Sequence, residues 1–511
     1  MYILAHDLGT SGNKATLFSA EGEILDSAFA AYRSFHGQNG EAEQDPEDWW
    51  AAVVSSTRDL LSRHPTTAKQ IVVVGFSGHM MGCLPLDSSG NALCRSWLHS
   101  DTRSVSQAVR MAEIMGPERF FRLTGNPADP HYPFSKIMWL KEHHPDVYRR
   151  TACFIQSKDY IAGRLTGRSG FTDYTDASLS GLFDMTGRDW CDEVLEVAEI
   201  EREKMPEILE SRTVIGRVSR DAAEATGLME GTPVVIGGGD GACAAVGAGA
   251  VCVGDAYNYL GSTSWVSAVT EKPLLDDQMR LFVLCNLDAR TYSLLGTVQC
   301  AGTSYEWVAD ALCAEETSKA ARTGENRFSA IDALARQAPP GSDLLLFLPY
   351  LTGERAPIWD PNTRGVYYGL SLNHGKSHLV RAVLEGVGYA LRSIIEVMEE
   401  LGTDIRQVTT IGGGAEGRLW REILAGVFNR PVLAPEHLRE ATSYGAAIAA
   451  GIGVGLFEDY GIAKQLINMR DEIRPEPSWS EVYEAGYSVF RELYPALRPS
   501  FAALAEARRV M

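Results

Sequence analysis

Short apolar runs separated by glycine turns open the chain. Residues 1–25 contain an apolar strand, a glycine turn with hydroxyl side chains (DLGTSG, 7–12), a second strand KATLF, a turn at Glu21 and Gly22, and a third strand EIL. Such alternation is typical of strands joined by tight turns, so we predict a β-meander here. Residues 255–269, DAYNYLGSTSWVSAV, repeat the order of strand, glycine and hydroxyl turn, and strand. The chain therefore contains the same opening twice.

A helical pattern follows the first opening. In DPEDWWAAVVSSTRDLL (45–61), Asp45 occupies the N-cap position and Pro46 the first helical position. Apolar residues at helical spacing predict that the buried face of this helix contains Trp50, Val53, Val54 and Leu61. The next segment, IVVVGFSGHMMG, combines an apolar strand with a glycine turn.

The second half repeats this order. The segment HLVRAVLEGVGYALRSIIEVMEEL (378–401) has apolar residues at helical spacing and leads into a strand and a glycine turn, QVTTIGGGAEG. Two halves of one plan predict an α/β protein with a duplicated fold and a ligand-binding cleft between the halves. We place the N-terminal domain at 1–246 and the C-terminal domain at 247–511.

The composition narrows the class of protein. The 511 residues are 45% hydrophobic, and 47 Lys and Arg against 66 Asp and Glu give a net charge of −19. This charge repels phosphate backbones and anionic lipids, so we expect neither nucleic acid nor a membrane as partner. The nine scattered cysteines form no CxxC pair, which indicates neither a disulfide framework nor a zinc site. Because the sequence has no basic leader and no long apolar stretch, we expect a cytoplasmic protein.

Both glycine turns are candidates for phosphate binding. Backbone N–H groups in such turns cradle phosphate oxygens, and hydroxyl and ammonium groups add donors. A single LGTSG is more often only a tight hairpin turn, but its paired occurrence favours two turns that share one ligand. In the first turn the candidate phosphate contacts are Thr10, Ser11 and Lys14.

Asp7 follows the first strand and precedes the first glycine turn. Its carboxylate would lie beside a bound polyphosphate, and two anions together require a cation. Mg²⁺ is the hard, oxygen-seeking ion that supplies this charge, so we favour Asp7 as a magnesium ligand. The alternative is that Asp7 only accepts hydrogen bonds from the amides of its own turn.

One acidic residue, Asp240, stands among glycines and alanines in VVIGGGDGACAAVGAG (234–249). It follows a strand and precedes a helix-like run, so one interpretation is a helix N-cap. The other is a general base, because flanking glycines let a substrate approach and a carboxylate near the γ-phosphate can accept the proton of an attacking hydroxyl. We favour the general base.

Seven motifs in a fixed order resemble those of the FGGY carbohydrate kinases, and the GERAP, EGVGYAL and GGGA stretches resemble most those of the xylulokinases within that family. The seven motifs are DLGTSGNK (7–14), YPFSKIMWLKEH (132–143), GGGDGA (237–242), LGSTS (260–264), PYLTGERAP (349–357), GVYYGLSLNHGKSHLVRAVLE (365–385) and GGGAEGRLWREILAGVFNRPV (412–432). The resemblance implies a duplicated ribonuclease-H-like, actin-type fold whose two domains close over a sugar and MgATP. It also implies that Asp240 takes a proton from a terminal sugar hydroxyl as this oxygen attacks the γ-phosphate.

The resemblance implies nucleotide contacts in the C-terminal domain as well. It assigns the phosphates to Gly261, Ser262 and Thr263, and the adenosine to Gly413, Gly414 and Ala415. The glycines after QVTTI could form only a turn, but close backbone approach to a flat ligand is the favoured account.

The expected sugar site departs from the xylulokinase pattern. The GQMHG stretch of that group is GHMMG here, so His79 replaces a glutamine and Met81 replaces a histidine, with Met80 between them. The residue after Asp240 is Gly241 instead of asparagine. Losing a side chain that reads a sugar hydroxyl can change discrimination by orders of magnitude, so these differences bear on the sugar and leave the kinase chemistry unaffected.

A second departure lies in HSDTR, where the related proteins carry WNDxR. Asp101 and Arg103 are candidates for sugar contact, and a structural ion pair between them is an equal alternative. His79 is a candidate for a hydrogen bond to a sugar hydroxyl, although a single histidine is more often structural.

We therefore expect an enzyme that uses ATP and Mg²⁺ to phosphorylate a ketopentose such as D-xylulose. The first alternative is a kinase for another ketose or polyol, such as ribulose, gluconate, glycerol or an erythritol-like compound. The second is a non-catalytic ATP-binding module of the actin fold. The C-terminal segment RELYPALRPSFAALAEARRVM is amphipathic, which would allow a homodimer contact.

Overall fold

The computed structural model describes residues 1–509, and the chain in it forms two compact units. The first unit consists of 1–253, 270–293 and 440–467, and the second of 254–269, 294–439 and the chain from 468 onward. Two segments from the second half of the sequence thus belong to the first unit. The domain boundary between residues 246 and 247 stays a prediction.

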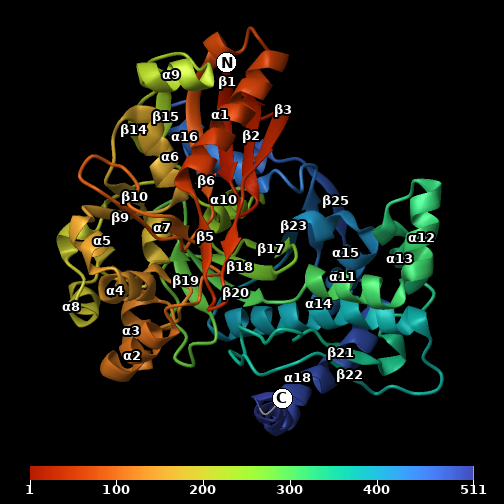
Figure 1. Cartoon of the computed structure of the whole chain (residues 1–511). Helices are drawn as coiled ribbons and strands as arrows, with labels where there is room; N and C mark the ends of the chain where they lie inside the picture. The colour runs from red at the N-terminus through yellow and green to blue at the C-terminus, as the bar shows by residue number, and fades with distance from the viewer. Residues whose placement is uncertain (510–511) are drawn as a thin grey trace. The chain divides into compact units, whose positions relative to one another are not determined.

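The first unit is built on a mixed sheet of order β14-β15-β6-β1-β2-β3, which the short strand β16 joins by pairing with β6. Its strands are β1 (Tyr2–Leu8), β2 (Gly12–Ser19), β3 (Ile24–Ala31), β6 (Ile71–Gly78), β14 (Val214–Arg217), β15 (Pro233–Val235) and β16 (Gly238–Gly239). β1 pairs antiparallel with β2 and parallel with β6. The predicted β-meander is confirmed, since β1, β2 and β3 run side by side at the red end of the chain (Figure 1).

Helix α1 (Pro46–Arg63) contacts β2 and β3 and begins as predicted. Asp45 is its N-cap and accepts a hydrogen bond of 3.0 Å from the N–H of Glu47. The predicted buried face is wrong at three of its four positions, because only Val53 is buried, whereas Trp50, Val54 and Leu61 are partly exposed. Trp49 and Leu60 are buried instead. The indole N–H of Trp49 donates to Gln44 Oε1 (2.8 Å), and this partner allows the ring to be buried.

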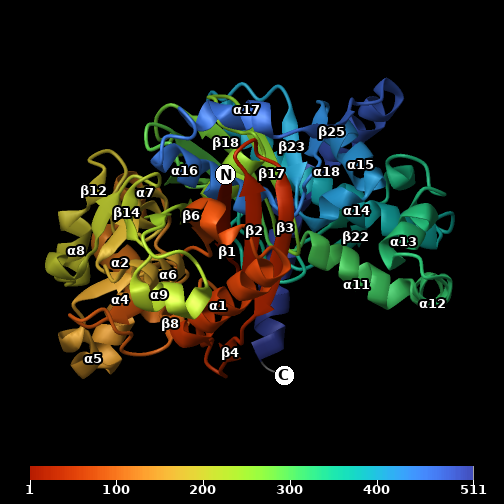
Figure 2. The same ribbon diagram turned by 90° about the horizontal axis from the view of Figure 1, so that it is seen from above.

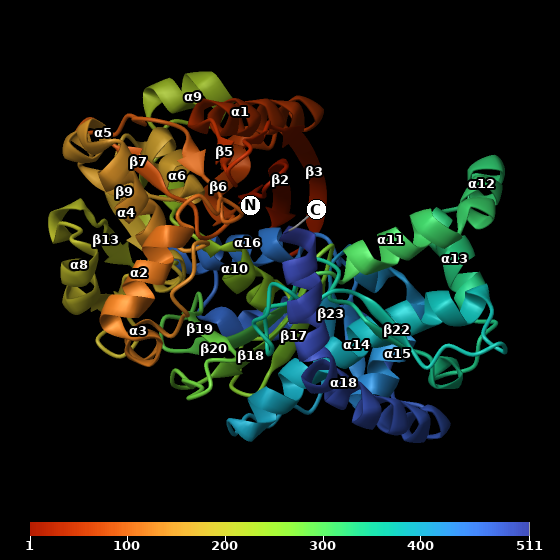
Figure 3. The ribbon, with the colours of Figure 1, turned by 60° about the horizontal axis from the view of Figure 1, so that its bottom comes forward.

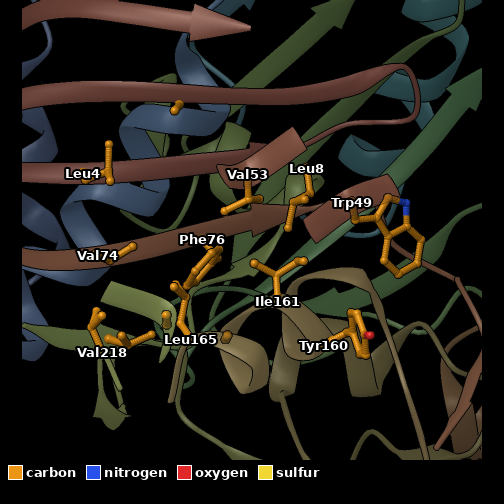
Figure 4. Close-up of a cluster of buried hydrophobic side chains, with 14 of the residues drawn as sticks. Leu4, Leu8, Trp49, Val53, Val74, Phe76, Tyr160, Ile161, Leu165 and Val218 are labelled. Carbon is orange, nitrogen blue, oxygen red and sulfur yellow. The ribbon is translucent and has the colours of Figure 1, made fainter. Parts of the chain in front are cut away.

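The core of the first unit lies between this sheet and the helices beside it (Figure 4). Leu4 and Leu8 of β1 and Phe76 of β6 pack in one cluster with Val53 of α1. Ile161, from helix α6 (Ser157–Thr166), completes the contact. The strand ends that carry Asp7 and His79 are thus fixed by buried apolar side chains.

Two helices from distant parts of the sequence lie side by side in the first unit, α10 (Asp240–Gly247) and α16 (Ala441–Gly453) (Figure 3). Glycine is required at their contact. A Cβ on Gly247 would lie 1.8 Å from the carbonyl oxygen of Ala441, and a Cβ on Gly445 would lie 2.1 Å from that of Cys243. This close approach brings the start of α16 to the first unit.

The remaining elements of the first unit are shorter. They are β4 (Phe35–His36), β5 (Ala42–Gln44), β7 (Leu84–Leu86), β8 (Ser96–Trp97), β9 (Cys153–Ile155), β10 (Phe171–Asp173), β11 (Phe183–Asp184), β12 (Asp189–Trp190), β13 (Glu207–Leu209), β19 (Phe282–Cys285), α2 (Val105–Met115), α3 (Pro117–Thr124), α4 (Pro133–His143), α5 (Pro145–Arg150), α7 (Tyr174–Ser178), α8 (Asp192–Ala198), α9 (Arg220–Thr226) and α17 (Ala463–Leu466).

The sheet of the second unit repeats the topology of the first. It contains β17 (Ala256–Leu260), β18 (Ser264–Thr270), β20 (Tyr292–Val298), β23 (Val408–Ile411), β24 (Val432–Pro435) and β25 (Met469–Ile473), in the order β25-β24-β23-β17-β18-β20. β17 pairs antiparallel with β18 and parallel with β23, as β1 pairs with β2 and β6. The predicted duplication of an α/β fold is therefore confirmed.

The long helix of the second unit is α14 (Lys376–Glu400), close to the predicted 378–401, and α15 (Arg418–Phe428) packs against it (Figure 2). Its predicted apolar stripe is buried, as at Val380, Val387 and Ile394. The other elements of the second unit are α11 (Gly302–Leu312), α12 (Ala314–Thr323), α13 (Arg327–Ala335), β21 (Leu346–Leu348), β22 (Val366–Tyr368) and α18 (Pro477–Arg509). Within residues 1–509, no helix has both the length and the apolar character needed to cross a membrane.

Candidate active site

The turn between β1 and β2 is held in place by its carbonyl oxygens. The hydroxyl of Tyr32 donates to the carbonyl oxygen of Gly9, and the Gln44 amide donates to that of Thr10 (2.7 Å). The backbone N–H of Tyr32 donates to the carbonyl oxygen of Ser11 (3.2 Å). The side chains of Thr10 and Ser11 remain exposed. The carbonyl oxygens of the turn thus face hydrogen-bond donors within the protein. Its exposed side, where the Thr10 and Ser11 side chains lie, is therefore suited to an anion.

Lys14 lies on β2, opposite Asp7 of β1 in the sheet register. Its Nζ lies 3.5 Å from Glu440 Oε1, and both side chains are about one-quarter exposed. The sequence-based assignment of Lys14 to the phosphates stays a prediction, and in this structure its ammonium group has a carboxylate partner from the start of α16.

Asp7 is half-buried at the end of β1. Its Oδ2 accepts a hydrogen bond of 2.5 Å from the hydroxyl of Thr442, which α16 supplies. Its Oδ1 is buried and has no hydrogen-bond partner among the described residues. Burial raises the pKa of Asp7, while the Thr442 hydroxyl and the Lys14 charge lower it. The interaction found for Asp7 is therefore with a distant helix.

Asp240 is the first residue of α10, and the N-cap of that helix is Gly239. The N-cap interpretation of Asp240 is thus wrong, since the N–H of Gly241 donates to its Oδ1 (2.8 Å) from within the first turn. Burial, and then the negative charge of Asp7, raise the pKa of Asp240 to about 7. A carboxyl group with this pKa can take up and release a proton near neutral pH, which is the property required of a general base.

The glycines before Asp240 are needed by the protein itself. A Cβ on Gly237 would lie 1.8 Å from the carbonyl oxygen of Phe76, and one on Gly239 would lie 2.4 Å from Met80 Cγ. A Cβ on Gly241 would meet only Met80 Sδ, at 3.7 Å, so there is room at this position. The reason given from the sequence, approach of a substrate, therefore does not explain Gly237 or Gly239. Close packing against β6 and the GHMMG stretch does.

His79 follows β6 directly and is 1% exposed. Its ring packs edge-on to Trp49, with 5.5 Å between the ring centroids. Neither ring nitrogen has a hydrogen-bond partner among the described residues. Burial, and then the positive charge of Lys136, lower the pKa of His79 to about 4, so the ring is neutral at pH 7. A neutral imidazole has one donor and one acceptor to offer.

Lys136, from α4, anchors the backbone around His79, a role that the sequence did not indicate. This buried ammonium group donates to three carbonyl oxygens, those of Met81 (2.8 Å), Leu98 (2.6 Å) and His131 (2.7 Å). Burial lowers its pKa to about 7. Met81 itself adopts a left-handed conformation, with φ of 61°, which costs a residue with a side chain free energy. The lysine therefore fixes a strained stretch of backbone.

Asp101 and Arg103 form the ion pair that was one of the two alternatives. Arg103 Nη2 lies 2.6 Å from Asp101 Oδ2 and 2.7 Å from Glu43 Oε1. Asp101 also accepts a hydrogen bond of 2.8 Å from the N–H of Ala42. Asp101 is fully buried, and the guanidinium of Arg103 stacks over Trp97 at 4.7 Å. These contacts support a structural role, and sugar contact by this pair stays a prediction.

The LGSTS turn of the second unit resembles the turn after β1. The N–H of Gly302 donates to the carbonyl oxygen of Gly261 (2.8 Å), and the N–H of Ala301 donates to that of Ser262 (3.0 Å). The side chains of Ser262 and Thr263 are exposed. In both units the turn after the first strand thus has anchored carbonyl groups and open hydroxyl groups. The phosphate assignment of Gly261, Ser262 and Thr263 fits this geometry and stays a prediction.

The glycines after β23 pack on the same strand end that carries the LGSTS turn. A Cβ on Gly414 would lie 2.6 Å from Leu260 Cγ, whereas a Cβ on Gly413 would meet nothing within 4 Å. Gly413 is exposed, and Ala415 is fully buried. Within the second unit, the two predicted nucleotide motifs are thus in contact through Leu260. Open space is found only at Gly413, and the adenosine contacts stay predictions.

The FGGY family models provide the finding that decides the family. The model of the N-terminal domain of the FGGY family of carbohydrate kinases matches residues 2–247, and the model of the C-terminal domain matches residues 256–454. The chain belongs to the FGGY family of carbohydrate kinases. The resemblance inferred from the seven motifs is confirmed. The expected class of activity, phosphorylation of a sugar with ATP by a carbohydrate kinase, is confirmed with it.

Similar proteins include two kinds of sugar kinase. The chain is 29% identical to gluconokinase of Bacillus subtilis over 99% of this chain and 98% of that protein. It is 31% identical to xylulose kinase of Escherichia coli K12 over 98% and 100% of the two chains. The ligand-bound xylulose kinase structure from Lactobacillus acidophilus matches with a TM-score of 0.90 and 26% identity over 98% and 99% of the chains. The duplicated two-domain α/β fold expected from the sequence is confirmed by this match.

Proposed function

We propose that this kinase transfers the γ-phosphoryl group of MgATP to a terminal hydroxyl of a ketopentose such as D-xylulose, with Asp240 as the general base. The base assignment rests on the environment of the Asp240 carboxyl group. Burial of this group and the negative charge of Asp7 raise its pKa to about 7. As the sugar oxygen attacks phosphorus, its proton passes to the carboxylate of Asp240. The bond from the γ-phosphorus to the bridging oxygen breaks, and ADP leaves with that electron pair.

Asp7 fits a ligand of Mg²⁺. Its Oδ1 is a buried oxygen without a partner among the described residues, while Oδ2 is held by Thr442. Mg²⁺ is commonly held by one or two carboxylates together with substrate phosphates. Residues 1–509 contain no group of three or more His, Cys, Asp or Glu side chains placed for a metal, so one carboxylate plus phosphates is the arrangement we propose. Bound there, the ion would neutralise charge on the phosphates.

The contacts to the reactants follow the residues assigned from the sequence. We propose that His79, Met80 and Met81 line the sugar site, that Thr10, Ser11 and Lys14 contact phosphates, and that the second unit adds Gly261, Ser262, Thr263, Gly413, Gly414 and Ala415. His79 has one unpartnered donor and one unpartnered acceptor, which a sugar hydroxyl can satisfy. A cytoplasmic setting and a homodimer remain expectations.

The charges around the GHMMG stretch favour a neutral sugar over gluconate. A sugar acid needs an available cation for its carboxylate. The guanidinium of Arg103 is already paired with Asp101 and Glu43, and the ammonium of Lys136 is bound by three carbonyl oxygens. The charges of both groups are thus already balanced by acceptors within the protein. The likeness to a gluconokinase nevertheless makes gluconate the second substrate to test.

The experiment is a measurement of ADP release by the full chain with MgATP and a panel of sugars. The panel contains D- and L-pentuloses, hexuloses, pentitols, glycerol and gluconate. The proposal predicts the highest kcat/KM with a ketopentose. A higher value with gluconate would replace the ketopentose and keep the kinase chemistry. No ADP release with any compound would contradict the proposal and favour a non-catalytic ATP-binding module.

A further inference from the structure

A chain of hydrogen bonds begins directly before Asp240 and ends in a buried cluster of charges. The backbone N–H of Gly239 donates to Thr175 Oγ1 (2.8 Å), and the Thr175 hydroxyl donates to Asp173 Oδ2 (2.7 Å). Asp173 Oδ1 in turn lies 2.8 Å from Lys158 Nζ. Thr175, Asp173 and Lys158 are all fully buried. The peptide that precedes the proposed base is therefore linked to charges inside the first unit.

The direction of these hydrogen bonds follows from the single proton of the Thr175 hydroxyl. A threonine hydroxyl carries one proton, so an oxygen that accepts from Gly239 directs its own proton to Asp173. Asp173 Oδ2 also accepts from the N–H of Thr175 (3.0 Å) and from the hydroxyl of Ser211 (2.7 Å). The carboxyl group of Asp173 is the acceptor in each of these hydrogen bonds. The hydroxyl of Thr175 cannot turn away without leaving the buried N–H of Gly239 unpaired.

Lys158 holds the acidic end of the chain. Its Nζ lies 2.5 Å from Asp159 Oδ1 and 3.0 Å from Asp176 Oδ2, in addition to Asp173. A single buried ammonium group surrounded by three carboxyl groups is strongly fixed in position, because each carboxyl group attracts it in a medium of low polarity. Asp173 thus has a rigid partner on one oxygen and Thr175 on the other.

The same cluster supports the stretch that carries His79. A Cβ on Gly78 would lie 3.0 Å from Lys158 Cβ, so the lysine stem packs directly against the end of β6. The N–H of Gly82 donates to Gln156 Oε1 (3.0 Å), and Gln156 is the N-cap of α6. Since β16 pairs with β6 at Gly239 and Gly78, one block of residues supports both strand ends.

We propose that Thr175 is a positioning residue for the base, because its hydroxyl, oriented by Asp173 and Lys158, fixes the Gly239 peptide and so the direction of the Asp240 side chain. The proposal rests on the proposed function of Asp240. A proton acceptor must lie within hydrogen-bond reach of the attacking hydroxyl. Gly239 pairs with Gly78 of β6, but it has no side chain to hold the peptide that precedes Asp240, so a side-chain partner for its N–H is a further restraint. The Thr175 hydroxyl supplies that restraint.

The test compares Thr175→Val with Thr175→Ser in the full chain, with MgATP and the sugar that the unaltered protein phosphorylates fastest. Valine keeps the shape and removes the hydroxyl, and serine keeps the hydroxyl. We expect Thr175→Val to lower kcat by about 10-fold or more, since misplacing a catalytic group by about 1 Å costs on the order of 100-fold. We expect the KM for ATP to stay within about 2-fold and Thr175→Ser to keep kcat within about 3-fold, because only positioning of the base is altered.

The matched control is Thr226→Val. The hydroxyl of Thr226 is also buried, accepts from the N–H of Leu228 (3.2 Å) and donates to the carbonyl oxygen of Ala222 (2.7 Å), at the end of α9. We expect Thr226→Val to lose about as much thermal stability as Thr175→Val and to keep its kcat unchanged.

Full kcat in Thr175→Val, an equal loss in Thr175→Ser, or an equal loss in Thr226→Val would overturn the inference. These outcomes concern only Thr175, because the unaltered protein is active in each of them. If the unaltered protein phosphorylates no sugar, the proposed function fails first.

Discussion

Lys136 Nζ donates a hydrogen bond of 2.8 Å to the carbonyl oxygen of Met81, the fourth residue of the GHMMG stretch. The same ammonium group holds the carbonyl oxygens of Leu98 and His131, so three loops that are far apart in sequence converge on one buried charge. The side chains proposed for sugar binding therefore project from backbone whose position depends on Lys136.

Replacing this lysine should affect the sugar more than the nucleotide. Lys136→Met keeps the length of the side chain but removes a donor from three carbonyl oxygens, of which that of Leu98 still accepts from the N–H of Asp101 (3.1 Å). Because each unsatisfied buried group costs about 1–3 kcal/mol, we expect the free energy of unfolding to fall by at least about 2 kcal/mol. We expect the KM for the sugar to rise by about 10-fold and the KM for ATP to stay within about 2-fold.

The control for Lys136 lies on the same helix. Lys141 Nζ donates to the carbonyl oxygen of Glu199 in an exposed position, so Lys141→Met should leave both KM values unchanged. Steady-state kinetics and thermal unfolding of the three proteins make the comparison. An unchanged sugar KM in Lys136→Met would show that the three loops keep their arrangement without the ammonium group.

Asp240→Asn should separate binding from chemistry. The amide keeps the size of the side chain but cannot accept a proton, so we expect kcat to fall by about 10²–10⁴-fold, the usual contribution of a general base. ATP binding, measured by calorimetry, should be nearly unchanged. Asp221→Asn, at an exposed acidic residue in the first turn of α9, is the control and should keep full activity. Wild-type turnover in Asp240→Asn would mean that another group takes the proton.

The pH dependence of the reaction should report the same carboxyl group. Asp240 must be ionised to accept a proton, and its pKa in the free protein is about 7. We therefore expect kcat/KM for the sugar to rise about tenfold per pH unit below that pKa and to level off above it. Initial rates from pH 5 to 9 at constant ionic strength test this expectation. A profile that is flat between pH 5 and 7 would contradict a base of this pKa.

Much of the fold follows from local pattern. The turns at 7–12 and 260–264, the N-cap Asp45 and the stripe of α14 each depend on residues close together in sequence, and the structure contains all of them. The face of α1 was predicted less well. Trp49 and Trp50 are adjacent and equally apolar, and the choice between them depends on the amide of Gln44, which binds the Trp49 indole.

The residues that hold the site residues in place could not be predicted from local sequence patterns. Thr442 contacts Asp7 across 435 residues of sequence, and nothing near either residue indicates the pairing. Lys136 lies in the motif YPFSKIMWLKEH, but its three hydrogen-bond partners are backbone carbonyl groups, which have no signature in the sequence. The chemistry of a site can thus be inferred from its side chains, whereas the groups that position them depend on tertiary packing.

The raised pKa of Asp240 also has a consequence for stability. The pKa of an aspartate is about 3.9 in an unfolded chain, and that of Asp240 in the folded protein is about 7. At a pH between these two pKa values, Asp240 is therefore protonated in the folded protein and ionised in the unfolded protein. Unfolding then releases a proton, and the contribution of Asp240 to stability decreases as pH rises from about 4 to 7. Asp240→Asn removes this contribution. We therefore expect the variant to be more stable than the unaltered protein at pH 8, with a difference of at most about 4 kcal/mol that shrinks toward pH 4.

Differential scanning calorimetry of both proteins at several pH values between 4 and 8 measures this difference as a shift in Tm. Effects of pH on groups that do not interact with Asp240 are common to the two proteins and cancel in the comparison. A Tm difference that is constant with pH would mean that the carboxyl group is not destabilised in the folded state, and the proposed base would then lack the property that suits it to neutral pH. A difference that grows with pH would show instead that the site carries a carboxylate at a cost in stability, as expected where a charge is retained for catalysis.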